Sequence, residues 1–272
     1  DMENDAMFFG GSAIRKVLIT TSPRAKLKTF KLCFELKKVI PNAEKTFKLC
    51  FELKKVIPNA EIVSRKNVAI KRVVRQAIER GFSDLMVVHE DRKKPNGIVF
   101  CHLPNGGIVF CHLPNGPTAF FKINSLQYSK QIKDVGEATE HYDVGEATEH
   151  YPELILTNFN TRLAKTVSRM FACLFPQKAD YGGRRVVTFH NQRDYVFFRH
   201  HRYEFKKEYE FKKEGQKAAL HELGPRMTLR LKWLQKGTFD TRGGEYEFYV
   251  KRHDMEKSRR HDMEKSRRRF ML

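Results

Sequence analysis

The sequence predicts an α/β protein built from small mixed sheets with packed helices. Short β-branched runs such as KVLITT, residues 16–21, alternate with stretches in which apolar residues recur every three or four positions. One run, residues 226–234, alternates basic and apolar side chains with the period of a strand. The 272 residues are 40% hydrophobic, which is enough for one sizeable core or two small ones and excludes disorder throughout.

In the first part of the chain, a buried strand at residues 16–21 should end at Ser22-Pro23. A helix should follow and stop at Pro41, because apolar residues recur at helical spacing up to that point. A second strand is expected at 61–64, a second helix at 68–81 and a third strand at 84–89. Turns at 94–97 and 114–116 should bracket a strand at 108–113, and a last strand is expected at 118–123.

The second part should begin after an acidic linker. A helix is expected at 161–175, with Asn160 as its N-cap and Pro176 as its stop, followed by strands at 185–190, 194–205 and 226–234. In the last strand one face should be apolar and buried and the other basic and exposed. The buried set would be Met227, Leu229, Leu231 and Trp233, and the exposed set Arg226, Thr228, Arg230 and Lys232. We therefore divide the chain into an N-terminal extension (1–15), a first half (16–133), a linker (134–151), a second half (152–240) and a basic tail (241–272).

Five segments are each followed at once by a verbatim copy. They begin at residues 28, 97, 134, 203 and 252, with unit lengths of 17, 10, 9, 6 and 8 residues. A solenoid repeats one structural unit at a fixed period with diverging sequence, so these copies are not a repeat architecture. We expect one structural role per pair.

The charge of the chain points to a polyanionic partner. Lys and Arg outnumber Asp and Glu by 52 to 32, which leaves a net charge of +20, and one copy of every repeat can be removed without changing it. Such a balance favours nucleic acid or an anionic membrane surface. No apolar run approaches the roughly 20 residues that span a bilayer, and the first residues are acidic, so we expect a soluble intracellular protein whose partner is RNA or DNA.

Two segments carry the residue types that bind RNA. The run 193–207 mixes basic residues with aromatic ones, which neutralise phosphates and stack on unpaired bases respectively. In a strand some of these aromatic residues must point inward, and we expect most of them to pack in the core while the Arg and Lys side chains contact RNA. The basic face of 226–236 contacts phosphates or is merely solvated. The candidate RNA-binding residues in these two segments are Arg193, Arg199, His200, His201, Arg202, Lys206, Lys207, Arg226, Arg230, Lys232 and Lys236.

A third candidate lies at the end of the first strand. Thr20, Thr21 and Ser22 could hold a phosphate at a helix N-terminus with help from Arg24, or their hydroxyls could simply cap the helix. The basic tail, residues 251–269, is either an RNA-binding arm or a solvated charge run.

Nothing in the sequence indicates catalysis or a bound cofactor. The phosphate-loop, dinucleotide, nucleophile-elbow and zinc-protease motifs are absent, and the cysteines lack metal-site or disulfide spacing, so we expect them to be reduced core residues. His190, His200 and His201 could act as acid and base on RNA, but histidines in a basic strand are more often contacts or core residues. We predict that the protein is not an enzyme and binds no metal, cofactor or small-molecule substrate.

Six short segments spread along the chain form a recognisable set. They are Ile19-Thr20-Thr21-Ser22, Glu90-Asp91-Arg92-Lys93, His112-Leu113-Pro114-Asn115-Gly116-Pro117-Thr118, Phe189-His190-Asn191-Gln192-Arg193-Asp194-Tyr195, Glu222-Leu223-Gly224-Pro225-Arg226 and Leu234-Gln235-Lys236-Gly237-Thr238-Phe239-Asp240. Taken in order they cover about residues 16–240, and together they resemble the Brix-domain family of ribosome assembly proteins, in particular its ribosome production factor type.

The resemblance implies a Brix domain of two similar α/β halves, each like the anticodon-binding domains of certain aminoacyl-tRNA synthetases. It also implies a nucleolar, hence nuclear, protein that binds pre-ribosomal RNA of the large (60S) subunit, a companion assembly factor and other pre-60S proteins, and no membrane. Residues 189–203 are similar to the family's sigma-70-like motif, which is associated with RNA binding. The alternatives are a protein-interaction module with incidental RNA contact and a small-subunit factor of the same family.

Overall fold

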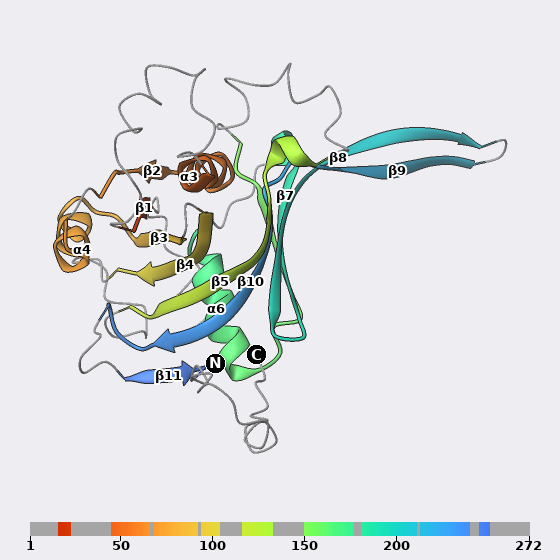
Figure 1. Cartoon of the computed structure of the whole chain (residues 1–272). Coiled ribbons are helices and arrows are strands. Elements are labelled where there is room, and N and C mark those ends of the chain that lie inside the picture. The colour runs from red at the N-terminus through yellow and green to blue at the C-terminus, as the bar shows by residue number, and fades with distance from the viewer. Residues whose placement is uncertain are drawn as a thin grey trace.

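The computed structural model confirms the predicted mixed α/β fold (Figure 1). It describes residues 16–22, 45–65, 68–91, 94–103, 116–132, 150–176, 181–210, 213–239 and 245–250, and within β8 and β9 the side chains of 206–210 and 213–218 are outside this description. Most of the predicted linker and tail lies outside the described residues, which include 150–151 of the linker and 245–250 of the tail. The first copy of the helical repeat, residues 107–115 of the second copy of the repeat that begins at residue 97, and the strand expected at 108–113 also lie outside them.

The described elements of the first half come in the predicted order of strand, helix, strand, helix and strands. Their first helix is formed by the second copy of the helical repeat, because the segment in which that helix was predicted lies outside the described residues. Its elements are β1 (Val17–Thr21), α3 (Lys45–Val56), β2 (Ala60–Ile62), α4 (Ile70–Glu79), β3 (Asp84–Asp91), β4 (Lys94–His102), β5 (Thr118–Gln127) and a 3-10 turn (Ser129–Gln131). The turn predicted at 94–97 is wrong, because these residues open β4 and Lys94 already pairs with Asp91. Gly97 is needed there for close packing, since a Cβ atom would lie 2.5 Å from the Phe120 ring.

The second half contains the predicted helix and strands and three strands that the sequence did not predict. Its elements are β6 (Glu153–Thr157), α6 (Arg162–Ala172), a 3-10 turn (Tyr181–Gly183), β7 (Arg185–Gln192), β8 (Tyr195–Glu210), β9 (Lys213–Glu222), β10 (Arg226–Gln235) and β11 (Tyr246–Tyr249). The strands β6, β9 and β11 are the unpredicted ones. The N-cap of α6 is Thr161, not Asn160, because the Thr161 hydroxyl accepts a hydrogen bond from the Ala164 N–H at 3.1 Å.

All described strands join one sheet in which the two halves repeat the same pairing pattern. The main order is β2-β1-β3-β4-β5-β10-β8-β7-β6. In the first half β1 and β3 are parallel, and β4 and β5 follow as antiparallel neighbours. In the second half β6 and β7 are parallel, and β8 and β10 follow in the same way. The halves meet where β5 and β10 pair antiparallel, so the two predicted half-sheets form one continuous sheet.

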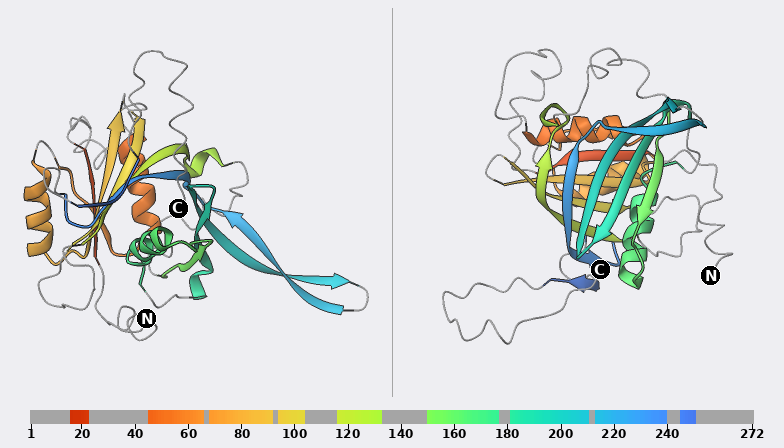
Figure 2. Two further views of the ribbon diagram at one scale, coloured as in Figure 1. Left: turned by 90° about the horizontal axis from the view of Figure 1, so that it is seen from below. Right: turned by 90° about the vertical axis from the view of Figure 1, so that its right-hand side faces the viewer.

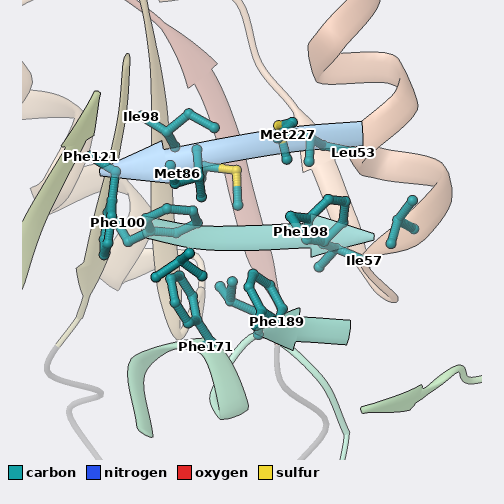
Figure 3. Close-up of a cluster of buried hydrophobic side chains, with 14 of the residues drawn as sticks. Leu53, Ile57, Met86, Ile98, Phe100, Phe121, Phe171, Phe189, Phe198 and Met227 are labelled. Carbon is teal, nitrogen blue, oxygen red and sulfur yellow. The ribbon is translucent and has the colours of Figure 1, made fainter. Parts of the chain in front are cut away.

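The main core lies on one face of this sheet, which we call the inner face. It is covered by α3 from the first half and α6 from the second, while α4 lies on the opposite side (Figure 2). Phe171 of α6 stacks on Phe189 of β7 with ring centroids 4.3 Å apart and also contacts Phe100 and Phe121 of the first half. Figure 3 shows these rings together with Phe198. Because both halves contribute to this core, they are expected to fold together.

On the opposite face, which we call the outer face, α4 covers the first half. There α4 packs Ala77 against a cluster that includes Leu85, Val87 and Val99, and Trp233 near the end of β10 also joins this cluster. No helix among the described residues belongs to a hydrophobic cluster on the outer face of β7, β8 or the part of β10 before Trp233. In the described part of the chain, this region of the outer face is therefore left without a covering helix.

Beyond the body, β8 and β9 continue as a two-stranded ribbon that projects away from the sheet (Figure 1). The repeat that begins at residue 203 lies here, with its first copy in β8 and its second at the tip of the ribbon. For the repeats at 28 and 97, one copy each is described, as α3 and as β4. The expectation of one role per pair stays a prediction.

Candidate nucleic-acid interface

The outer face of the second half, which we call the open face, carries basic and aromatic side chains. It consists of Lys122 of β5, His190 of β7, Tyr195, Phe197, Arg199 and His201 of β8, and Thr228 and Arg230 of β10. Lys122 is exposed and the other seven are partly exposed. These side chains lie together because the register aligns three antiparallel strands and places alternate residues on one side.

Successive side chains of β8 point to opposite faces of the sheet, so the residues of the basic and aromatic run are divided between the inner and the outer face. Val196 and Phe198 point inward and are 0% and 2% exposed. Tyr195, Phe197 and Tyr203 are only partly buried, and Phe205 is 54% exposed. The expectation that most of the aromatic residues of this run pack in the core is therefore wrong, because Phe198 alone among them is buried.

In β10 the predicted alternation is confirmed up to Leu231. Met227, Leu229 and Leu231 are buried on the inner face, and Arg226, Thr228 and Arg230 lie on the other side. The prediction is wrong for Trp233, which lies with Phe120 in the outer cluster because the register shifts between Leu231 and Trp233. A single extra residue in one strand reverses the side of every residue after it.

Two arginines of the open face lie over aromatic rings. The guanidinium carbon of Arg230 is 5.4 Å from the centroid of the Tyr195 ring, and that of Arg199 is 5.7 Å from the Phe197 ring. Arg199 also donates hydrogen bonds to the carbonyls of Phe198 and Met227, at 2.8 and 3.2 Å. These contacts hold charged planar groups at defined positions on the sheet.

Glu222 neutralises part of the positive charge beside the open face. Its carboxylate accepts two hydrogen bonds from Arg226 and lies 3.9 Å from the Nε of Arg199. Burial by itself raises the pKa of Glu222, but the hydrogen bond and charge of Arg226, with the charges of Arg199 and His201, outweigh it and lower that pKa. Arg226 is thus tied to an acidic neighbour. For Arg230 and Lys122, by contrast, no carboxylate partner occurs among the described residues.

The two neighbouring histidines of β8 lie on opposite sides of the sheet. His200 is 5% exposed, and its Nδ1 is 2.9 Å from the Gly224 carbonyl oxygen. Burial, followed by the charge of Arg185, lowers the pKa of His200 to about 3, so its ring is neutral at pH 7. The structure therefore places His200 in the core rather than on an RNA-facing surface, whereas His201 lies on the open face.

The remaining candidates of the two basic segments are scattered. Arg193 is exposed in the two-residue turn between β7 and β8, where it and Asp194 both have positive φ. Arg202 follows His201 with its Nε buried, and Lys206 and Lys207 lie on the projecting ribbon. Lys232 occupies the irregularity in β10, and Lys236 beyond its end pairs with Glu245.

The candidates at the end of β1 are not on the surface. Thr20, Thr21 and Ser22 are 1%, 2% and 6% exposed, and the Ser22 hydroxyl accepts a hydrogen bond from the Glu90 N–H. A phosphate could reach these side chains only if the surrounding structure moved. Arg24 and the helix expected after it lie outside the described residues.

Three of the cysteines are described, and they are free thiols in the core, as expected: Cys50, Cys101 and Cys173. Burial raises the pKa of Cys50 and of Cys101 to about 12. Within the described residues no cluster of three or more histidine, cysteine or acidic side chains could hold a metal ion. No described helix is both long and apolar enough to cross a membrane.

Sequence reasoning missed Lys122 and Glu222 as parts of this region, and it named Thr228 as exposed but not as a binding candidate. Lys122 is the one charged residue of β5, and it joins the open face only because β5 pairs with β10 and Lys122 faces Arg230. Glu222 stands four residues before Arg226, so the ion pair could have been suspected from the spacing alone.

These features define the class of the protein as a mixed α/β domain made of two similarly connected half-sheets, with one open basic and aromatic face. The model of the Brix domain matches residues 41–233, and the chain belongs to the Brix-domain family. The resemblance noted from the sequence is thereby confirmed.

Curated relatives match nearly the whole chain. A Brix domain-containing protein of Caenorhabditis elegans is 55% identical over 261 residues, which are 95% of this chain and 57% of that protein. Ribosome production factor 1 of Danio rerio is 46% identical over 245 residues, 90% of this chain and 61% of that protein. The chain thus spans about three fifths of the length of these relatives. Among solved structures, a probable ribosomal biogenesis protein from Aeropyrum pernix K1 matches 80% of this chain and 96% of its own, with 17% identity and a TM-score of 0.46.

Proposed function

We propose that this protein is a ribosome biogenesis factor that binds pre-ribosomal RNA on its open face as a non-enzymatic scaffold. The names of its relatives support the process, since Ribosome production factor 1 of several animals matches more than 90% of the chain. We include in this proposal that the protein acts in large-subunit assembly and rRNA maturation, and that it is located in the nucleolus. We also include that it binds a companion assembly factor, and that residues 134–151 separate its two halves.

The observation that carries the proposal is the open face itself. A charge of +20 would be compatible with many partners, but here cationic side chains are concentrated on a sheet face without a covering helix in the described structure. Arg230 and Lys122 lie opposite each other across β10 and β5. Such a pair can neutralise adjacent phosphates and release their counterions.

A scaffold role, rather than catalysis, is supported by the placement of the histidines. His200 and His201 were the neighbouring pair that could have acted as acid and base. They project to opposite sides of β8, and the neutral His200 ring lies in the core. Turnover of a pre-ribosomal RNA fragment by the purified protein, lost on substitution of His201, would contradict the proposal.

The proposal is tested by charge reversal on the open face. The double variant Arg230→Glu with Lys122→Glu should weaken binding of a pre-ribosomal RNA fragment at least about tenfold, and should lower the slope of log affinity against log salt by about two. Fluorescence anisotropy over a salt series measures both quantities.

The matched control is Arg162→Glu with Lys165→Glu, which makes the same charge change on the exposed side of α6. This control should weaken RNA binding only two- to threefold, through the net charge. Equal losses in the two variants would mean that RNA binds elsewhere.

A companion protein is proposed to dock at the β6 end of the sheet. No described strand pairs with the outer edge of β6, and Ile155 in this strand is 41% exposed. An open edge with an exposed aliphatic side chain can accept a partner strand. Ile155 lies on the same side of the sheet as Arg199, so the test removes its aliphatic side chain without adding charge. Ile155→Ser should reduce co-sedimentation with pre-ribosomal particles while RNA binding by the purified protein persists, and Val63→Ser, at a site 39% exposed near the opposite end, is the control.

A further inference from the structure

The aromatic side chains of the open face need an explanation beyond phosphate binding. Phosphates require positive charge alone, and the outer face of the first half shows how aliphatic residues fill such positions when a helix covers them. On the open face, Tyr195 and Phe197 occupy neighbouring outward positions of β8 and stay partly exposed. Exposed planar rings on a sheet are the feature on which unpaired bases stack.

The spacing of the two rings selects for bases that are not stacked on each other. Tyr195 and Phe197 are two residues apart on one strand, so they are separated by about 7 Å, twice the strand rise. Bases in a duplex follow each other at about 3.4 Å and hide their faces in the stack. Two bases that each lie on one of these rings must therefore be splayed apart, as in a single-stranded segment.

The arginines complete two planar and charged positions. Arg230 lies over Tyr195 and Arg199 lies over Phe197. A base can lie on either plane of such a pair, because guanidinium groups stack on bases as aromatic rings do. Lys122, next to Arg230 and exposed, stands where it could contact the phosphate of the same nucleotide.

Short polar side chains surround the rings and can read the edges of a base. The register aligns Phe197 with two polar residues on either side, in a row across five neighbouring strands. In strand order the row is Thr157, His190, Phe197, Thr228 and Ser125. The Thr157 hydroxyl and His190 Nδ1 are 2.7 Å apart, so these two side chains orient each other. Hydroxyl and imidazole groups both donate and accept hydrogen bonds, which suits the Watson–Crick edge of an unpaired base.

We infer that the open face binds unpaired nucleotides of an RNA, with one base on the Tyr195–Arg230 pair and one on the Phe197–Arg199 pair, in preference to duplex RNA. This inference rests on the proposed function, since it names the class of RNA bound at the same site. A duplex would contact only the cationic groups and would leave the rings and the polar row unused.

The test compares two RNA ligands of equal length and mixed sequence, a single strand of twelve nucleotides and a blunt duplex. Fluorescence anisotropy at physiological salt should give a single-strand affinity at least tenfold higher than the duplex affinity. The variant Tyr195→Leu with Phe197→Leu keeps apolar volume but removes the planes. It should lose about tenfold or more in single-strand affinity, because stacking contributes about 1–3 kcal/mol per base, and should bind duplex within twofold of the unaltered protein.

Two further variants distinguish the loss of stacking from the loss of charge and from the general effect of removing exposed aromatic side chains. Arg230→Lys keeps the charge and removes the planar group, so only single-strand binding should fall, by several-fold. Tyr181→Leu with Tyr249→Leu removes two exposed tyrosines from other parts of the surface, 69% and 52% exposed, and should change neither affinity. The same single strand with 2-aminopurine at its centre should show quenched fluorescence with the unaltered protein and recover it with the leucine variant.

The outcomes distinguish this inference from the proposed function. Duplex binding as tight as single-strand binding, or equal losses of both in the leucine variant, would overturn the inference and leave RNA binding by the open face intact. Salt-independent binding, or no binding of either RNA, would overturn the proposed function as well. The leucine variant should unfold at nearly the same urea concentration as the unaltered protein, because both rings lie outside the core.

Discussion

The outer faces of the two half-sheets differ although their strands pair in the same order. On the first half, Leu85, Val87 and Val99 lie under α4 and are 1–2% exposed. On the second half, the corresponding strands β7 and β8 present His190, Phe197 and Arg199 on a face without a covering helix among the described elements. One half thus uses this face for stability and the other leaves it available for binding.

The difference follows from the connections between the parallel strands. The described connection from β1 to β3 contains two helices, α3 on the inner face and α4 on the outer face. The described connection from β6 to β7 contains α6, which packs on the inner face. Without a counterpart of α4, apolar residues on the outer face of the second half would stay in water, so polar, basic and aromatic residues occupy it. A difference in one crossover therefore leaves one face of a repeated scaffold without a covering helix among the described residues.

The largest expected effect comes from placing a charge on each face. Val87→Asp buries a carboxylate under α4 and should lower the free energy of unfolding by about 4 kcal/mol or more, because a buried unpaired charge is strongly unfavourable. Thr228→Asp makes the same chemical change on the open face and should cost less than about 1 kcal/mol. Urea unfolding of the two variants compares the faces directly. Similar losses would mean that the open face is covered in the folded protein.

The next largest effect is the pH dependence of stability that arises from His200 on the inner side of β8. Burial and the charge of Arg185 lower the pKa of His200 in the folded protein to about 3, against about 6.5 in the unfolded chain. The stability that depends on neutral His200 is therefore complete above pH 6.5 and is lost as the pH falls toward 3. Between pH 7 and pH 5 the loss should be on the order of 2 kcal/mol. His200→Asn can still donate to Gly224 but does not titrate, so urea unfolding at both pH values should show a correspondingly smaller loss. An unchanged pH dependence would place the acid sensitivity elsewhere.

The smallest expected effect is a change in RNA affinity when a negative charge beside the open face is removed. Glu222→Gln removes the carboxylate that neutralises Arg226 and lies close to Arg199, so RNA affinity should rise about two- to fivefold at physiological salt. Glu245→Gln, at a 73% exposed carboxylate that pairs with Lys236, is the control and should change RNA affinity less. Equal increases in fluorescence anisotropy titrations would indicate an effect of net charge only.

Much of the local structure could be predicted because it depends on short-range patterns. The β-branched run of β1 and the helical spacing of α4 are confirmed within two residues of their ends, and α6 is confirmed but ends three residues before the predicted position. The strand β6 was missed because ELILT is too short to show a period, and it is stabilised by its parallel partner β7. The turn at 94–97 was wrong because Pro-Asn-Gly is a turn signal that pairing of Glu90 with Pro95 overrides.

The composition and order of residues along this chain determined its basic charge, its strand and helix sequence and its family, because these depend on residue type and local spacing. Only the tertiary structure decided which basic side chains share a surface. Arg230 and Lys122 are more than a hundred residues apart and meet through the pairing of β5 with β10, whereas His200 and His201 are neighbours separated by the two faces of one strand. A strand directs successive side chains to opposite sides, and its partners are chosen by the whole sheet, so the open face exists only once both half-sheets have joined.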